Sequence, residues 1–226
     1  MKLPETDLRL RNTHRLVPSR YPSAGILDAI ASPGDLEAVI ELESWTNDRV
    51  SAELGLLHRI PREEWVAGRP LATVIMAAFC HPRPGGGRFN GPDRGAWYAS
   101  RSLETAHAEA IFHRTAELAE IGVFDTYVQE RVYLADVRGR FHDIRAEAPA
   151  YRGYYSATSY TASQKLAHEL LIEGSNGIIY RSVRDPGGQC LACFRPKLVA
   201  NVRQGDHYEY RWTGRPAPVI RRLGGR

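Results

Sequence analysis

Apolar residues recur at helical spacing in three segments of the chain. In the first segment, Ser32 is a suitable N-cap, and the pattern predicts a helix over Pro33–Glu43. In the second, Ser102 predicts the start of a helix that runs to about Glu120, with Gly122 just beyond its end.

The third helical segment begins at Thr161, where Thr161 and Gln164 have the spacing of a capping box. Gly174 is placed to end this helix, and four apolar residues share one of its faces: Leu166, Ala167, Leu170 and Leu171. A shorter helix is predicted at Arg62–Val66, because Pro61 can open it.

Other segments have the composition of strands. Leu71–Phe79 is rich in β-branched and small apolar residues, which predicts a buried strand. The dense prolines and glycines of Pro82–Gly87 predict a loop after it. Further strands are predicted at Gly95–Ser100, Arg131–Val137, Arg140–Ile144, Gly177–Val183, Leu191–Val202 and His207–Trp212, the second and third of these joined through Arg138 and Gly139.

Strands and helices therefore mix without strict alternation, which predicts an α+β fold with a mostly antiparallel central sheet flanked by helices. We expect a single domain over residues 1–226, with a partly helical N-terminal extension at 1–70 and a flexible tail at 213–226. The chain has no apolar run long enough to cross a membrane, and Met1–Arg11 lacks the apolar core of a signal peptide. These features predict a cytoplasmic protein.

The formal net charge is +4, and only three of the 30 basic residues are lysines. Such a preference for arginine suits phosphate recognition, but a GC-rich genome would produce it too. The arginines are scattered singly, which argues against a nucleic-acid-binding tail. Cys80, Cys190 and Cys193 are too few for a disulfide framework, and the Cys190–Cys193 pair lacks a second pair for zinc.

Four polar residues are candidates for chemistry. Arg88 follows the glycine loop and could grip a pyrophosphate, although most arginines simply lie at the surface. Tyr98 could stack on a flat ring or belong to the core. Glu109 has small or apolar helical neighbours, so its carboxylate needs a partner, a task or access to water. Ser182 could face a pocket from the predicted strand or bond to backbone.

Together these residues resemble the RES family, which is named after an arginine, a glutamate and a serine. The match consists of Gly-Arg-Phe-Asn at residues 87–90, a tyrosine ten residues after the arginine, a glutamate eleven residues later and a late Tyr-x-Ser segment. The resemblance runs from about Thr13 to Pro196. Family members often have tryptophan at the position of Phe89 and proline at that of Arg181, and compact members lack the long N-terminal part through residues 46–49.

The resemblance implies an ADP-ribosyltransferase-like fold and a toxin of a type II toxin–antitoxin pair that cleaves the nicotinamide–ribose bond of NAD. It implies the catalytic residues Arg88, Tyr98, Glu109 and Ser182, with Arg88, Asn90, Tyr98, Tyr180 and Ser182 in NAD binding. Arg88 would hold the phosphates, Tyr98 would pack on the nicotinamide or its ribose, and Glu109 would face the cationic ribose. Ser182 would fix the nicotinamide end, and Tyr180 and Arg184 are weaker candidates. No metal is implied.

The resemblance also implies a cognate antitoxin that occludes the active site. For a chain of this length we favour transfer of ADP-ribose to a protein, with phosphorolysis or hydrolysis of NAD as the alternative. Two other classes stay open: an RNA-directed toxin, which the basic charge permits, and a noncatalytic binding module. The sequence lacks a lysine-rich stripe or a clustered aromatic platform, so we expect no direct contact with nucleic acid.

Overall fold

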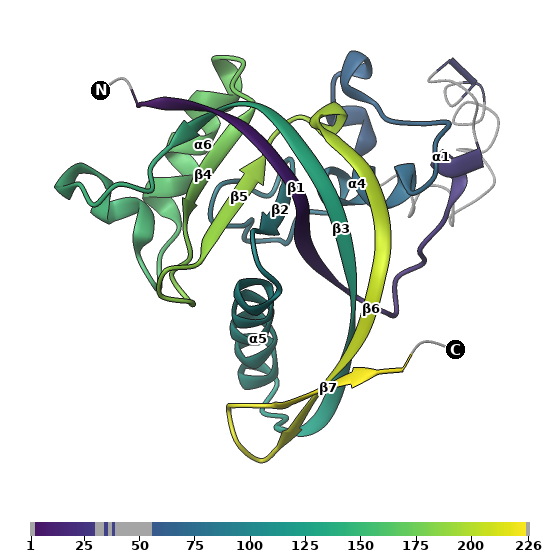
Figure 1. The fold of residues 1–226 in the computed structure, drawn as a ribbon, viewed down its shortest axis with the longest axis vertical. Coiled ribbons are helices and arrows are strands. Elements are labelled where there is room, and N and C mark those ends of the chain that lie inside the picture. Colours follow the sequence, from purple (N-terminus) through teal and green to yellow (C-terminus); the bar gives the residue numbers. More distant parts are fainter. Residues whose placement is uncertain (1–2, 30–33, 36–37, 39–55, 225–226) are drawn as a thin grey trace.

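The computed structural model describes residues 3–29, 34–35, 38 and 56–224 (Figure 1). Seven strands form one sheet in the order β1-β2-β5-β4-β3-β6-β7. Their bounds are Glu5–Pro18 for β1, Trp97–Ser100 for β2, Asp125–Asp143 for β3, Gly177–Arg181 for β4, Gln189–Cys193 for β5, Val199–Thr213 for β6 and Val219–Leu223 for β7. Among these pairings only β3–β4 is parallel, which confirms the α+β prediction of a mostly antiparallel sheet.

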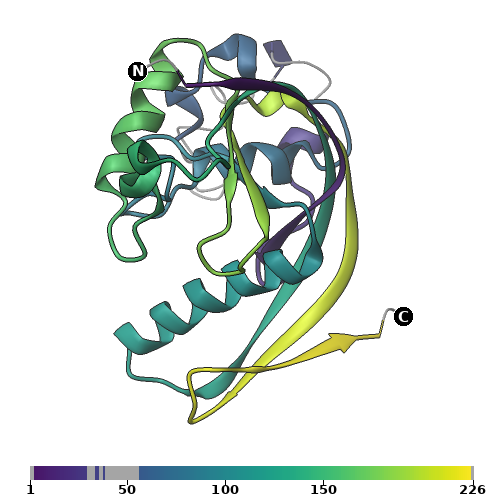
Figure 2. The same cartoon turned by 60° about the vertical axis from the view of Figure 1, so that its left-hand side comes forward.

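The sheet curves because β1 pairs with β3 as well as with β2, so that β1, β2, β5, β4 and β3 close into a ring. The α-helices are α1 (Ile26–Ala29), α4 (Ala72–Cys80), α5 (Leu103–Glu120) and α6 (Thr161–Ile172), and the 3-10 helices are η1 (Leu57–Arg59), η2 (Arg62–Glu64), η3 (Pro149–Tyr155) and η4 (Pro196–Leu198). Figures 1 and 2 show α5 and α6 on the same side of the long curved ribbon of β1, β3 and β6. Within the described residues, no helix has the length and apolar character needed to span a bilayer.

Three apolar clusters hold these layers together. The largest packs α4 against β1, β2, β3 and the segment 57–66. A second packs α6 and η3 against β4 and β5, and a third lies between α5 and the outer parts of β3 and β6. The three cysteines are buried and form no disulfide, so they pack as small apolar residues.

Helix α5 begins and ends as predicted. The Ser102 side chain accepts a hydrogen bond from the backbone N–H of Thr105 at 3.1 Å, and Gly122 follows the helix with a φ of 68°. Strand β2, the short helix after Pro61 and the buried face of α6 also match the prediction. Most of the predicted helix Pro33–Glu43 lies outside the described residues.

The predicted strand at Leu71–Phe79 is wrong, because this segment forms α4. Every residue of α4 except Ala77 is buried, so neither a period of two nor one of 3.6 could appear in its sequence. The two strands predicted at Arg131–Val137 and Arg140–Ile144 are one continuous strand, β3, in which Gly139 pairs with Leu8. Long pairing with β1 carries the ladder through this glycine.

Other boundaries also differ from the prediction. β4 ends at Arg181, one residue before Ser182. The predicted strand at Leu191–Val202 is divided between β5 and β6 by the turn at η4, and β6 absorbs the predicted His207–Trp212 strand. Thr161 is the first residue of α6 and not its cap, so the capping box is wrong.

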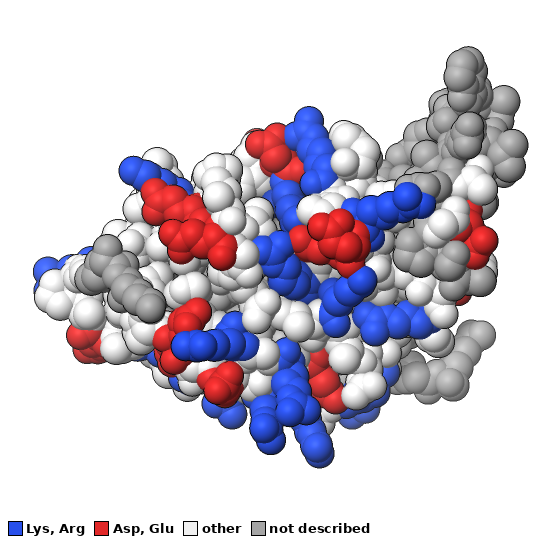
Figure 3. All heavy atoms as spheres, turned by 90° about the horizontal axis from the view of Figure 1, so that it is seen from above, with Lys and Arg blue, Asp and Glu red and all other residues white. Residues whose placement is uncertain are grey.

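Both ends of the chain contribute strands that the sequence did not predict. Residues 5–18, expected in a partly helical extension, form β1 and belong to the central sheet. Residues 219–223, expected in a flexible tail, form β7 and pair with β6. Both strands carry many charged residues; β1 alternates apolar and polar residues only over Asp7–Arg11, and β7 has no alternating run. Basic and acidic side chains lie close together on the face shown in Figure 3, so the positive charge does not collect into one patch there.

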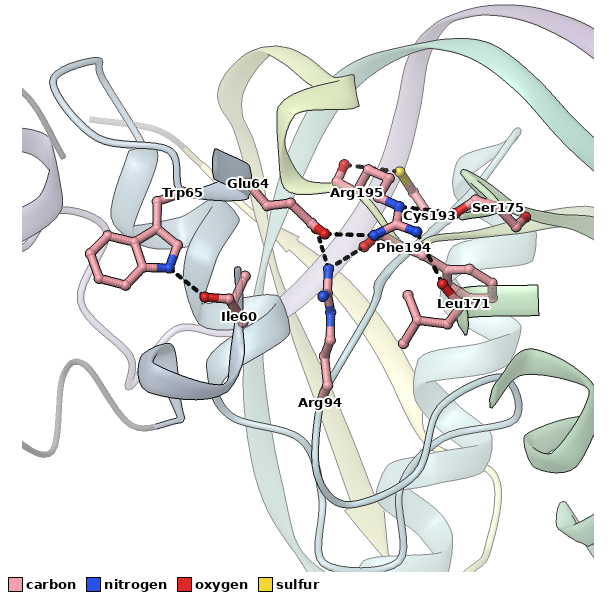
Figure 4. Close-up of polar contacts among 9 residues, drawn as sticks. All are labelled: Ile60, Glu64, Trp65, Arg94, Leu171, Ser175, Cys193, Phe194 and Arg195. Atoms are coloured by element: carbon pink, nitrogen blue, oxygen red, sulfur yellow. Dashed lines mark hydrogen bonds and ion pairs between the residues drawn. The ribbon is translucent and has the colours of Figure 1, made fainter. Parts of the chain in front are cut away.

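A largely buried ion-pair network fastens segment 56–66 to the domain (Figure 4). Glu64 pairs with Arg94 and, at 2.5 Å, with Arg195. Arg94 also donates to the carbonyl of Phe194, and Arg195 donates to the carbonyls of Leu171 and Ser175 at the end of α6. One carboxylate thus connects η2, the loop before β2, β5 and α6.

We expect Glu64→Ala to destabilise the fold by roughly 3 kcal/mol, because it leaves two poorly solvated guanidinium groups without their carboxylate. Urea denaturation measures this difference. Glu63→Ala, which removes an exposed carboxylate from the same turn, should change stability little. Equal losses in the two variants would contradict this role of Glu64.

Candidate active site

The glycine loop before β2 is built around the hydroxyl of Tyr98. This hydroxyl donates to Asn90 Oδ1 at 2.8 Å and accepts the backbone N–H of Phe89 at 2.7 Å. A Cβ on Gly87 would lie 2.7 Å from the same hydroxyl, so only glycine fits here. Burial raises the pKa of Tyr98 well above its ordinary value, and the phenol stays neutral.

Helix α6 holds this loop from the other side. Gln164 Nε2 donates to the carbonyls of Gly85 and Gly87 at 2.9 and 3.0 Å. The residue that the sequence placed in a capping box therefore anchors the loop that precedes Arg88.

Arg88 is buried and holds the segment after η3. Its Nη1 donates to the carbonyls of Tyr154 and Ser156 at 3.0 and 2.9 Å, and its guanidinium lies 4.7 Å from the ring centre of Tyr160. Among the described carboxylates, none forms an ion pair with Arg88. This cation is therefore held by carbonyl dipoles and an aromatic face, and its charge is not neutralised by a salt bridge.

Glu109 and Ser182 meet directly, although 73 residues separate them. Ser182 Oγ donates to Glu109 Oε1 at 2.6 Å and accepts the backbone N–H groups of Arg184 and Asp185 at 3.0 Å each. Asp185 in turn accepts the hydroxyl of Thr105 at 2.6 Å, which ties the turn after β4 to the first turn of α5. The Glu109 carboxylate on α5 is half-buried, and Ser182, directly after β4, holds it in position.

Tyr180 joins the two halves of the site. Its ring packs edge-on against Phe89 with the ring centres 4.7 Å apart. Burial raises the pKa of the Tyr180 phenol, Glu109 and Tyr98 raise it further, and Arg88 acts in the opposite direction. The predicted residues Arg88, Asn90, Tyr98, Glu109, Tyr180 and Ser182 thus lie in one neighbourhood (Figures 1 and 2 show their elements).

The site also contains His113 and Arg83, which the sequence did not single out. His113 lies one helical turn after Glu109 on α5, and its Nδ1 faces Arg83 Nη1 at 3.0 Å. The pKa of His113 is lowered to about 3, mainly by burial. The positive charges of nearby arginines lower it as well, in decreasing order Arg83, Arg114, Arg184 and Arg88. His113 is therefore a neutral imidazole among guanidinium groups, in surroundings that favour an anion.

Arg184 is the second guanidinium of this group that has no ion pair with a described carboxylate. It lies 3.3 Å from the ring centre of Phe112 and donates to the carbonyl of Ala157 at 2.7 Å. The resemblance made Arg184 a weaker candidate, and its place near His113, on which Arg88 also acts, comes from tertiary packing. The i,i+4 spacing of Glu109 and His113 is the one signal that could have indicated His113.

The described residues contain no group of three or more His, Cys, Asp or Glu side chains placed to hold a metal ion. The arrangement instead combines a fixed carboxylate and hydroxyl with nearby cations. Such a site can bind an anionic substrate and stabilise positive charge that develops beside Glu109.

Comparisons with known proteins place the chain among relatives. The family model for the RES domain matches residues 56–213. An uncharacterised protein of Sinorhizobium fredii, y4oC, is 30% identical over 203 residues, which cover 89% of this chain and 83% of that protein. A chain of the MbcT–MbcA toxin–antitoxin complex of M. tuberculosis aligns with a TM-score of 0.48 at 13% identity, over 91% of this chain and 87% of its own length.

The lowered pKa of His113 predicts a pH dependence of stability. Below the ordinary histidine pKa of 6.5, His113 is protonated in the unfolded chain but stays neutral in the folded protein. The free energy of unfolding therefore falls as the pH drops from about 6.5 towards about 3. We expect His113→Gln to lose less stability than the wild type over this range, as measured by urea midpoints. The exposed His168→Gln serves as the control, and an unchanged slope for His113→Gln would count against a buried neutral imidazole.

Proposed function

This chain belongs to the RES-domain family, and we propose that it is a toxin that cleaves the nicotinamide–ribose bond of NAD. The observation that carries the proposal is the 2.6 Å hydrogen bond between Ser182 and Glu109. The same site contains Arg88 and Arg184, which have no carboxylate partner among the described residues. An NAD molecule needs both features, because it carries a pyrophosphate and its cleavage builds positive charge on a ribose.

The phosphates would lie near Arg88 and Arg184, where a bidentate guanidinium can contact two oxygens at once. Arg83 and the neutral His113 stand next to them and add a cation and a hydrogen-bonding ring. The carbonyl contacts of Arg88 keep its guanidinium in place before the substrate arrives, which lowers the entropy lost on binding.

The ribose would lie against Glu109. As the carbon–nitrogen bond breaks, its electron pair leaves with neutral nicotinamide, and the ribose carbon becomes cationic. The carboxylate stabilises this charge, and Ser182 holds the carboxylate in position. An acceptor oxygen then bonds to the ribose carbon and releases its proton. We favour a protein as the acceptor, and phosphate or water would give phosphorolysis or hydrolysis.

The ring of Tyr98 would pack on the nicotinamide or its ribose, while its hydroxyl maintains the glycine loop with Asn90. Tyr180 would support Phe89 beneath the site. We also propose that a cognate antitoxin occludes this site, since RES toxins are paired with such proteins.

We expect Glu109→Gln and Ser182→Ala to release nicotinamide from NAD roughly 100- to 1,000-fold more slowly than the wild type. The Gln variant keeps a hydrogen-bond acceptor but removes the negative charge that faces the ribose. The matched control is Glu120→Gln, which changes an exposed carboxylate at the far end of the same helix. Wild-type rates in folded Glu109→Gln protein would remove Glu109 from the chemistry.

The acceptor is identified with NAD labelled in its ADP-ribose part. The purified protein is incubated with this NAD alone, with inorganic phosphate, or with a cell lysate. We expect a labelled protein band in the lysate; free ADP-ribose or its phosphate adduct would favour hydrolysis or phosphorolysis instead. Binding of RNA without any release of nicotinamide would contradict the whole proposal.

A further inference from the structure

A cavity of about 440 Å³ lies between η3 and the end of β4, outside the candidate active site. Its lining residues are Glu147, Ala148, Pro149, Arg152, Tyr155 and Arg181. Two guanidinium groups thus face one carboxylate across a space of the size that binds small molecules. Pro149, Ala148 and the Tyr155 ring supply an apolar wall.

Arg181 is arranged to receive an oxyanion. Its guanidinium lies 5.0 Å from the ring centre of Tyr155, and its side chain is 36% exposed, so it is held in place while remaining accessible. Its ion pair with Glu147 is 2.5 Å long, but the Glu147 side chain is 85% exposed. Such an exposed pair contributes little, so an incoming anion can replace Glu147 at small cost.

The cavity shares two backbone walls with the active site. Arg181 lines the cavity, whereas the next residue, Ser182, bonds to Glu109. The ring of Tyr155 lines the cavity, whereas the carbonyls of Tyr154 and Ser156 receive Arg88. The Tyr155 hydroxyl closes this wall by accepting the backbone N–H of Arg181 and donating to the carbonyl of Ile144. A ligand in the cavity therefore occupies a second site behind the first.

We propose that this cavity binds a mononucleotide-sized ligand through a phosphate group. The phosphate contacts Arg181 and Arg152, and the base or sugar lies against Tyr155 and Pro149. A phosphate offers oxygens for the terminal nitrogens of Arg181, in place of the exposed Glu147, and for the exposed guanidinium of Arg152 at the same time. The proposal concerns binding alone and does not depend on NAD cleavage.

AMP, adenosine and inorganic phosphate are titrated into the ¹⁵N-labelled full chain, and binding is followed by NMR. AMP should shift the amide signals of residues 147, 148, 150–155 and 181, phosphate should shift the same signals more weakly, and adenosine should leave them nearly unchanged. Arg152→Glu should weaken AMP binding at these signals by about tenfold or more. Arg138→Glu makes the same charge change at an exposed position of β3 and should bind AMP as the wild type does.

Three results would overturn the proposal. Shifts confined to the surroundings of Arg88 and His113 would place AMP in the active site alone. Adenosine binding as tight as AMP would remove the phosphate from recognition. Equal weakening of AMP binding by Arg152→Glu and Arg138→Glu would show that the net charge of the protein, and not Arg152 itself, determines binding. Release of nicotinamide from NAD, measured on the same samples, tests the proposed function separately.

Discussion

The hydrogen bond between Ser182 and Glu109 makes a site out of two elements that are distant in sequence. It joins the middle of α5 to the turn after β4, and the Thr105–Asp185 contact fixes the same two elements one helical turn earlier. Neither element could hold the carboxylate alone, because a helix leaves a half-buried glutamate free to rotate and a turn leaves a serine exposed. Only the closed strand ring places β4 and β5 where α5 can reach them.

How far the sequence predicts this structure depends on whether its signals are local. The cap of α5 and the buried face of α6 depend on neighbouring residues, so they were predictable. The helix α4 was not, because burial on every side removes the periodicity that separates helix from strand. Strand β1 is charged and depends on its pairing with β3, a contact more than a hundred residues away that no local pattern records.

The candidate site shows the same division. Arg88, Tyr98, Glu109 and Ser182 could be singled out because their order and spacing resemble a family, but the contacts around them could not be predicted. The Tyr98 hydroxyl maintains the loop that presents Arg88, and Gln164 supports that loop instead of capping α6. Arg83 carries no such pattern, and Arg184 was only a weaker candidate. Their approach to His113 appears only once α5, the glycine loop and the turn after β4 are assembled.

The grouping of Arg83, Arg88 and Arg184 has a cost that the fold does not remove by itself. Like charges repel, and His113 is kept neutral by its burial and by these charges. Glu117 pairs with Arg83, but Arg88 and Arg184 have only carbonyl and aromatic partners among the described residues. Sequences selected for stability alone would place a carboxylate there. The lack of such a partner is explained if, as the proposed function requires, an anionic substrate brings the negative charge to these two cations.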